Sequence, residues 1–417
     1  MVKKYKGTRD LIPEEMSRFR LIEAIFRDSC LKWGYEEVRT PTLEYLHLFT
    51  STGTLTPNML GKVYSFLDWD GWSGERVVLR PDGTIPVARL YIDSGEGRRL
   101  AKFFYVTNVF SFEETGKEAR ERWQCGVELI GASSSIADVE LIIMALEVLK
   151  RLGIEGIELR LSHAGLIRAL LVKLGLSPGE QTKVFDQILD GNKEALAMQK
   201  PKAPELGEAL PLLLDLKGKS SGFLKNLRAL FARNMSELEP ALNDFISIVE
   251  LLEISGCNCQ IDIASGRGFE YYTGMIFQLF MGEEKIGGGG RYDALIPLMA
   301  GMDIPASGFA LYFDHLMKLV RPEIVAKPAA QKILIRTETG QPEAVKQGFD
   351  IARYLHEAGC LAEVHPGGPE PTNWRWTLDV QSKTPQFILN DQVKHKRFEA
   401  KTIDEVIIIL QNIAQGS

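Results

Sequence analysis

Apolar positions recur along the chain with two different periods. Over residues 13–33 and 137–151 they return every three or four residues, which predicts two amphipathic helices. Pro13 suits the first turn of the earlier helix, and Gly34 and Gly153 follow as helix-ending residues. Short apolar runs bounded by turn residues predict strands at 35–41, 103–110, 123–130, 157–161, 259–263, 275–280 and 308–313. We also predict a hairpin of 63–67 with 76–79 around Asp70-Gly71, and a loop at 50–61.

A long helical stretch interrupts this strand pattern. Leu and Ala recur at helical spacing from about 165 to 254, with breaks near Gly191 and at 201–204. Beyond it, strands predicted at 332–336, 361–365 and 386–389 accompany helices predicted at 343–358 and 403–413, as in a small α/β unit. We therefore predict a first core part at 1–165, a helical insertion at 166–255, a second core part at 256–320, a linker at 321–331 and a C-terminal α/β domain at 332–417.

Composition and charge narrow the class of protein. The 417 residues are 45% hydrophobic and 25% charged, and 49 basic against 55 acidic residues give a net charge of −6. That balance argues against a chain held to nucleic acid mainly by bulk charge. No apolar run is long enough to span a membrane, and no signal-peptide pattern follows the basic N-terminus. We expect a cytoplasmic protein.

The cysteines and histidines predict neither a metal site nor a cofactor. Cys257 and Cys259 form the one close pair among five scattered cysteines, which is a weak metal signal without a second pair. The six histidines lack the spacing of metal ligands. The run Gly287–Gly290 does not match a dinucleotide or phosphate-binding motif. It would permit close approach of the backbone to a ligand or to another strand, or it forms a tight glycine hairpin.

Two short segments carry polar groups that suit a small ligand. Asp82 and Thr84 follow a predicted strand and could hold a cationic group, although Pro-Asp-Gly is also an ordinary turn. Gln124, Gly126 and Glu128 share one face of the strand predicted at 123–130. A carboxylate and an amide that point inward need partners, which a bound polar ligand or a neighbouring arginine would supply.

A third segment, 267–274, combines Arg267 with Tyr271 and Tyr272 just before a predicted strand. A guanidinium beside tyrosine hydroxyls suits a carboxylate or a phosphate. The alternative is a turn followed by aromatic packing at a strand start.

In their order along the chain, these segments resemble the catalytic core of class II aminoacyl-tRNA synthetases, histidyl-tRNA synthetase in particular. The matching segments are 7–10, 34–44, 80–84, 124–128, 267–274 and 288–308. The resemblance implies an α+β fold with a six-stranded antiparallel sheet flanked by helices. It also implies a dimer formed partly through the segment around Pro41, and a C-terminal domain that resembles an anticodon-binding domain.

The resemblance further implies a histidine-binding pocket. Three residues match positions that hold the ammonium end of the amino acid: Asp82, Thr84 and Gln124. Four match positions that line the imidazole and the carboxylate: Glu128, Arg267, Tyr271 and Tyr272. The synthetase usually has glutamate at the first of these seven positions, so Asp82 reaches less far.

Two departures from the synthetase pattern change the expected function. Ser111 stands where the synthetase has an arginine that clamps the α-phosphate of ATP, and His315 stands where an arginine grips the γ-phosphate. Removing one such preorganised donor typically costs about 10²–10³ in rate. Arg120 or Arg122, in the same predicted loop, is a candidate substitute.

A synthetase core that keeps its amino-acid pocket and loses its ATP clamps is similar to the regulatory subunits of ATP phosphoribosyltransferase. The strings 161–165 and 269–274 also resemble that family. The resemblance implies a subunit without catalytic residues that activates the short-form catalytic subunit in the first step of histidine biosynthesis, with L-histidine as a possible effector. The alternatives are an active histidine–tRNA ligase and a stand-alone histidine-binding or RNA-binding module. Bases and acids balance in the C-terminal domain, so we do not expect tRNA as a partner.

Overall fold

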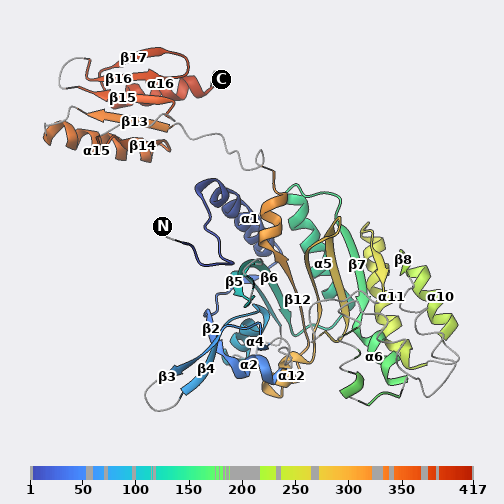
Figure 1. Ribbon diagram of the computed structural model, residues 1–417. Helices are drawn as coiled ribbons and strands as arrows, with labels where there is room; N and C mark the ends of the chain where they lie inside the picture. Colours follow the sequence, from blue (N-terminus) through green and yellow to red (C-terminus); the bar gives the residue numbers. More distant parts are fainter. Residues whose placement is uncertain are drawn as a thin grey trace. The chain divides into compact units, whose positions relative to one another are not determined.

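We describe the fold from a computed structural model of the chain (Figure 1). It describes residues 3–52, 60–69, 74–95, 100–113, 115, 119–173, 175–177, 179–181, 184, 187, 217–231, 236–263, 272–321, 332–337, 342–367, 374–381 and 385–415. Several predictions fall wholly or largely outside these residues. They are the loop at 50–61, the turn at Asp70-Gly71, the breaks near Gly191 and at 201–204, and the linker.

The chain forms two compact units, residues 1–322 and 323–417. The first unit contains both predicted core parts and the helical segment between them. The second contains the predicted C-terminal domain. The finer division into core parts, insertion and linker stays a prediction.

A nine-stranded sheet forms the centre of the first unit, in the order β1-β5-β6-β12-β11-β10-β7-β9-β8. The strands are β1 (Glu36–Glu37), β5 (Ala101–Phe110), β6 (Glu121–Ile130), β12 (Ala306–Tyr312), β11 (Glu284–Arg291), β10 (Met275–Met281), β7 (Glu158–His163), β9 (Gln260–Asp262) and β8 (Lys217–Gly218). From β5 to β7, all neighbouring strands pair antiparallel. The α+β fold with an antiparallel sheet flanked by helices is therefore confirmed.

Helix α1 (Pro13–Lys32) packs against α5 (Ser135–Arg151) and α13 (Phe313–Leu319), and all three helices pack against the sheet (Figure 1). The buried side of α1 carries Phe19, Ile22, Phe26 and Cys30, the spacing that its sequence predicted. Helix α5 begins at an N-cap serine, Ser134, whose hydroxyl accepts the Ala137 N–H. These helices form the layer that closes one face of the sheet.

The helical stretch between the two core parts is partly described. It contains α6 (Ala164–Lys173), α10 (Ser221–Phe231), the 3₁₀ turn η1 (Ser236–Leu238) and α11 (Glu239–Ile254). Helix α11 packs against both α10 and α5 (Figure 1). The two-residue strand β8 was not predicted here, since two residues carry no periodic signal.

A separate three-stranded sheet holds the predicted hairpin. Strands β3 (Ser65–Trp69) and β4 (Gly74–Leu79) pair antiparallel, and β2 (Leu43–Tyr45) joins the other edge of β4. The strand predicted at 35–41 is shorter than expected. Only β1 pairs in register with β5, and Val38 adds one more backbone hydrogen bond to Phe104, 2.9 Å long.

The structure shows which of the two interpretations of the four-glycine run is wrong. Gly287–Gly290 do not form a tight hairpin, because they lie in the middle of β11 between β10 and β12. A Cβ at Gly288 would lie 2.6 Å from the Phe277 carbonyl oxygen, and one at Gly289 would lie 2.6 Å from Phe309 Cα. The run therefore allows three strands to approach more closely than side chains would permit.

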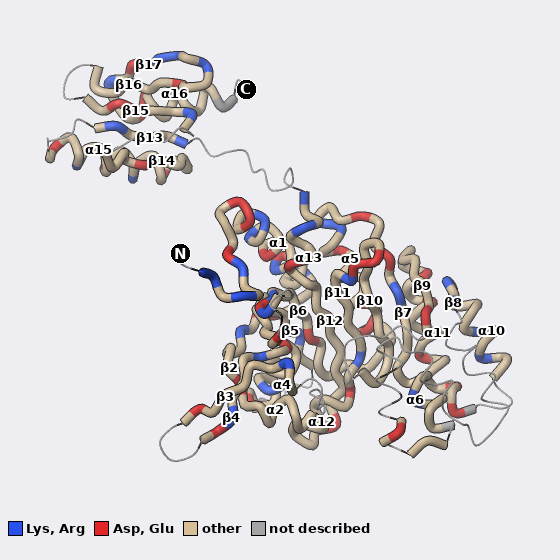
Figure 2. Tube along the Cα trace, viewed as in Figure 1, with Lys and Arg blue, Asp and Glu red and all other residues tan. Residues whose placement is uncertain are grey.

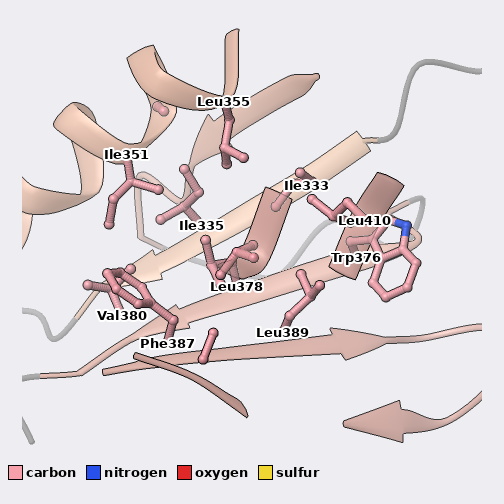
Figure 3. Close-up of a cluster of buried hydrophobic side chains, with 13 residues drawn as sticks. Ile333, Ile335, Ile351, Leu355, Trp376, Leu378, Val380, Phe387, Leu389 and Leu410 are labelled. Atoms are coloured by element: carbon pink, nitrogen blue, oxygen red, sulfur yellow. The ribbon is translucent and has the colours of Figure 1, made fainter. Parts of the chain in front are cut away.

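The second unit is a five-stranded sheet in the order β14-β13-β15-β16-β17. Its elements are β13 (Lys332–Thr337), α15 (Pro342–Glu357), β14 (Leu361–Val364), β15 (Trp376–Val380), β16 (Phe387–Asp391), β17 (Lys396–Ala400) and α16 (Ile403–Gln415). Both helices contribute to one hydrophobic core that contains Ile335, Leu355 and the fully buried Trp376 (Figure 3). Strands β15 and β17 were not predicted. A short basic cluster, Lys394-His395-Lys396-Arg397, is exposed in a turn and the first residues of β17.

Candidate functional site

Strand alternation places the predicted polar residues of β6 on the face away from α1 and α5. Cys125 and Val127 are fully buried toward those helices, whereas Gln124, Gly126 and Glu128 point to the other face. A small pocket lies there. It is lined by Asp82, Thr84, Gln124, Tyr272, Gly288, Tyr292, Gly308, Phe309 and Ala310. Its free volume is about 10 Å³, room for about one water molecule.

Glu128 forms the floor of this pocket. Its carboxyl group accepts hydrogen bonds from the hydroxyls of Tyr105, at 3.1 Å, and Tyr292. Only 2% of the residue is exposed. Burial raises the pKa of Glu128 to about 8, against the lowering effect of these hydroxyls. A cationic group beside it would favour the ionised carboxylate, so the site is suited to a ligand that carries positive charge.

Three glycines make room for this arrangement. A Cβ at Gly83 would lie 2.6 Å from Tyr105 Cζ, and one at Gly126 would overlap the same ring. A Cβ at Gly308 would lie 3.0 Å from Glu128 Cδ and closer still to its oxygen. The tyrosine ring and the carboxyl group thus occupy space that any other residue at these glycines would fill.

Asp82 lies both in a turn and in the pocket wall, the two roles that the sequence left open. Its carboxylate accepts the backbone N–H of Ile85 at 2.9 Å, in the first turn of α4 (Thr84–Asp93), and it also lines the pocket. Burial raises its pKa to about 6, and the backbone hydrogen bonds from Ile85 and Thr84 lower it less. Asp82 is therefore both a residue at the start of α4 and part of the pocket wall.

The structure brings together five of the seven predicted histidine-binding residues. Asp82, Thr84, Gln124 and Tyr272 line the pocket, and Glu128 is hydrogen-bonded to the lining residue Tyr292. Arg267 and Tyr271 lie outside the described residues. The binding of histidine to this set stays a prediction.

Sequence reasoning missed Tyr105 and Tyr292 as partners of Glu128. They come from β5 and from the residue after β11, and they reach Glu128 across strands that pair only in the folded sheet. The glycines at 83, 126 and 308 were the available signal, since each leaves out a side chain at the pocket wall.

A second, larger cavity of about 800 Å³ shares Asp82 and Gln124 with the small pocket. Its walls also contain Arg9, Arg122, Lys285, Asp314 and His315. Arg9 pairs with Asp314 at 2.8 Å, and His315 Nδ1 lies 2.5 Å from a carboxylate oxygen of Glu284. Burial lowers the pKa of Lys285 to about 8. Two side chains of this cavity that could bind an anion, Arg9 and His315, thus already have carboxylate partners.

Arg120 does not line that cavity. It is 2% exposed and lies between the rings of Tyr5 and Phe112, 5.2 Å and 5.1 Å from their centroids. Its guanidinium donates to the Tyr5 hydroxyl at 2.7 Å and to the Glu113 carbonyl. These contacts hold the Arg120 guanidinium between Tyr5 of the N-terminal segment and the residues Phe112 and Glu113. Of the two substitute arginines considered from the sequence, Arg122 is the one at the cavity wall.

Across the part of the chain that the structure describes, no three His, Cys, Asp or Glu side chains gather as metal ligands would. Within the same residues, no helix combines the length and the apolar character needed to cross a bilayer.

The antiparallel sheet and its pocket define a protein with the class II aminoacyl-tRNA synthetase fold. The sequence profile described as Histidyl-tRNA synthetase matches residues 7–316. An ATP phosphoribosyltransferase regulatory subunit from Dehalococcoides mccartyi is 52% identical over 98% of each chain. A histidine–tRNA ligase from Archaeoglobus fulgidus is 31% identical over 97% of this chain and 95% of the relative.

Among solved structures, a Bacillus halodurans protein described as an ATP phosphoribosyltransferase regulatory subunit/histidyl-tRNA synthetase has a TM-score of 0.74 and 25% identity. The alignment covers 89% of this chain and 95% of that one. The chain therefore belongs to the histidyl-tRNA synthetase family, in the branch that includes the ATP phosphoribosyltransferase regulatory subunits.

Proposed function

We propose that the chain is a non-catalytic regulatory subunit that activates a short-form ATP phosphoribosyltransferase in the first step of histidine biosynthesis. The observation that carries this proposal is the 52% identity, over 98% of both chains, to a relative of that name. The ligase relatives are more distant, at 31% to 34% identity.

The residues that the resemblance places at the ATP site of the synthetases support a non-catalytic role. Adenylate formation develops charge on ATP that fixed cations must stabilise. Ser111 has no charge to offer, and His315 lies beside Glu284, which would compete with any phosphate for it. Arg120 is held by Tyr5 and the Glu113 carbonyl.

Arg122 is the residue on which the competing proposal, an active histidine–tRNA ligase, would depend, because it lines the larger cavity. Histidine-dependent exchange between ATP and pyrophosphate separates the two functions. We expect no exchange above background from the purified chain. Robust exchange that disappears in Arg122→Ala would support the ligase and contradict a non-catalytic role.

We further propose that the small pocket binds L-histidine as the feedback effector. Glu128 supports this because it is a buried carboxyl group that can hold a cationic ligand. Glu128→Ala should weaken histidine binding by roughly tenfold or more in calorimetry, the usual effect of losing a hydrogen bond to a charged group. Glu140→Ala, on α5 outside the pocket, is the control and should bind as the wild type does. Equal affinities in both variants would mean that the effector binds elsewhere.

We also propose that the chain dimerises through the region around Pro41. The adjoining three-stranded sheet exposes five large apolar side chains, which are costly to leave in water: Leu43, Tyr45, Phe66, Leu67 and Trp69. We do not propose tRNA as a partner. Lys and Arg are interspersed with Asp and Glu along the backbone of the second unit (Figure 2), and Arg336 is paired with Asp379.

A further inference from the structure

Arg291, the last residue of β11, and Tyr292, which follows it, point to opposite faces of the central sheet. Tyr292 lines the pocket and donates to Glu128. Arg291 points the other way, where its guanidinium pairs with Asp138 of α5 and, at 3.0 Å, with Asp244 of α11. A single peptide bond therefore joins a residue of the pocket wall to a residue that contacts the helices on the other face of the sheet.

Arg291 belongs to a buried network. Asp244 also lies 3.1 Å from His163 Nε2 and accepts the Ser135 hydroxyl at 3.3 Å. The side chains of Arg291 and Asp138 are 10% and 1% exposed. Removing one partner from such a network leaves an uncompensated buried charge, so the ion pairs fix α11 and β11 relative to each other.

A second connection starts at the other tyrosine of the pocket. Arg168 of α6 donates to the backbone carbonyl of Tyr272 at 3.0 Å. The next residue, Thr273, donates its N–H to the Arg291 carbonyl at 2.8 Å and accepts the N–H of Asp293 at 2.9 Å. The segments that carry Tyr272 and Tyr292 are therefore one hydrogen-bonded unit, and it is attached to both α6 and α11.

The pocket must widen to admit a ligand. Its free volume of about 10 Å³ is far smaller than an amino acid, so a ligand that reaches Glu128 displaces lining groups. The β11 and β12 walls cannot easily give way, because their glycines are in close backbone contact. We expect the displacement at Tyr272 and at the end of β11, where Arg291 and Tyr292 follow the four glycines.

We infer that Arg291 is a positioning residue that couples occupancy of the pocket to α11. The stability of α11 then depends on whether the effector is bound. This inference rests on the proposed histidine pocket. A ligand shifts a conformational equilibrium only as far as it prefers one state, and here the preferred state is the one in which the tyrosine segments have moved with Arg291. By reciprocity, whatever fixes α11 changes the affinity of the pocket.

The test uses the full chain, L-histidine, calorimetry and hydrogen exchange over residues 239–254. Asp244→Asn keeps the shape of Asp244 and removes its charge, and Arg291→Met removes the guanidinium. If Arg291→Met fails to fold, Asp244→Asn alone decides the outcome. Arg151→Met is the matched control. It removes an arginine of α5 that bonds to Asp28 and Ser29, and it touches neither the pocket nor α11.

In the wild type and in Arg151→Met, we expect histidine to bind and to slow exchange in α11. In Asp244→Asn, affinity should fall by roughly three- to thirtyfold, the range that packed networks transmit, and saturating histidine should no longer slow exchange in α11. Wild-type affinity with undiminished protection of α11 in Asp244→Asn would overturn the coupling while leaving the histidine pocket intact. No heat with histidine in the wild type would overturn the pocket itself, and the coupling with it.

Discussion

Glu128 and Asp82 are two carboxyl groups in one pocket, and both are more easily protonated than usual. Burial is the main cause, and the charge of Asp82 raises the pKa of Glu128 further. The Tyr105 and Tyr292 hydroxyls keep Glu128 hydrogen-bonded in either protonation state. The pocket is therefore prepared for a positive group, which would replace the proton as the partner of the carboxylate.

The raised pKa of Glu128 predicts a pH-dependent stability. The folded chain holds this proton up to about pH 8, whereas the unfolded chain releases it near 4.5. Since the unfolded state binds fewer protons in this window, the Tm should fall as pH rises from 4.5 toward 8. Glu128→Gln, which stays neutral, should reduce that fall by at least about 3 °C.

Thermal unfolding followed by fluorescence at pH 5 and pH 8 checks this prediction. Gln124→Ala is the matched variant, because Gln124 lines the same pocket and carries no titratable group. It should keep the wild-type difference between the two pH values. If the Tm of Glu128→Gln falls as much as that of the wild type between pH 5 and pH 8, Glu128 is already ionised in the folded chain.

The elements divide into those that local pattern predicts and those that depend on pairing. Helices α1 and α5 and strands β5, β6 and β10 were predicted because their periodicity is carried by their own residues. β11 was not predicted as a strand, because four glycines have low strand propensity. Its place is decided by β10 and β12, which leave no room for a side chain.

The candidate site shows the same division. Gln124 and Glu128 could be assigned to one face from alternation alone, and Asp82 and Thr84 from a turn after a strand. Tyr105 and Tyr292 could not, since their relation to Glu128 is created by the register of β5, β6, β12 and β11. The network of Arg291 with Asp138 and Asp244 joins residues far apart in the chain, so no local pattern predicts it.

Gly289→Ala tests the close packing of β11. The added methyl group would lie 2.6 Å from Phe309 Cα and Cβ and would overlap the Gly308 carbonyl, so strands must separate. We expect a loss of about 1–3 kcal/mol in the free energy of unfolding, measured by chemical denaturation. Gly222→Ala, in α10, would place its Cβ at an ordinary contact distance of 3.6 Å from the Ser220 hydroxyl oxygen, so it should be neutral or gain up to about 1 kcal/mol. Equal stability of the two variants would contradict the packing described for β11.

At the scale of the whole molecule, the chain is a synthetase-like unit followed by a second unit with its own core. The first unit contains a pocket with a buried carboxyl group, and we propose that Ser111 and His315 stand where the synthetases have two phosphate-binding arginines. The pocket is connected through Arg291 to the helical layer. These features together suit a subunit that senses a small molecule and acts on a partner.

Reconstitution tests this account most directly. The purified chain is added to an isolated short-form ATP phosphoribosyltransferase catalytic subunit, and phosphoribosyl-ATP formation is measured with and without L-histidine. The account predicts that the chain raises the rate of formation until the catalytic subunit is saturated, and that histidine then suppresses it. A rate that stays at the level of the catalytic subunit alone, at every concentration of the chain, would contradict it.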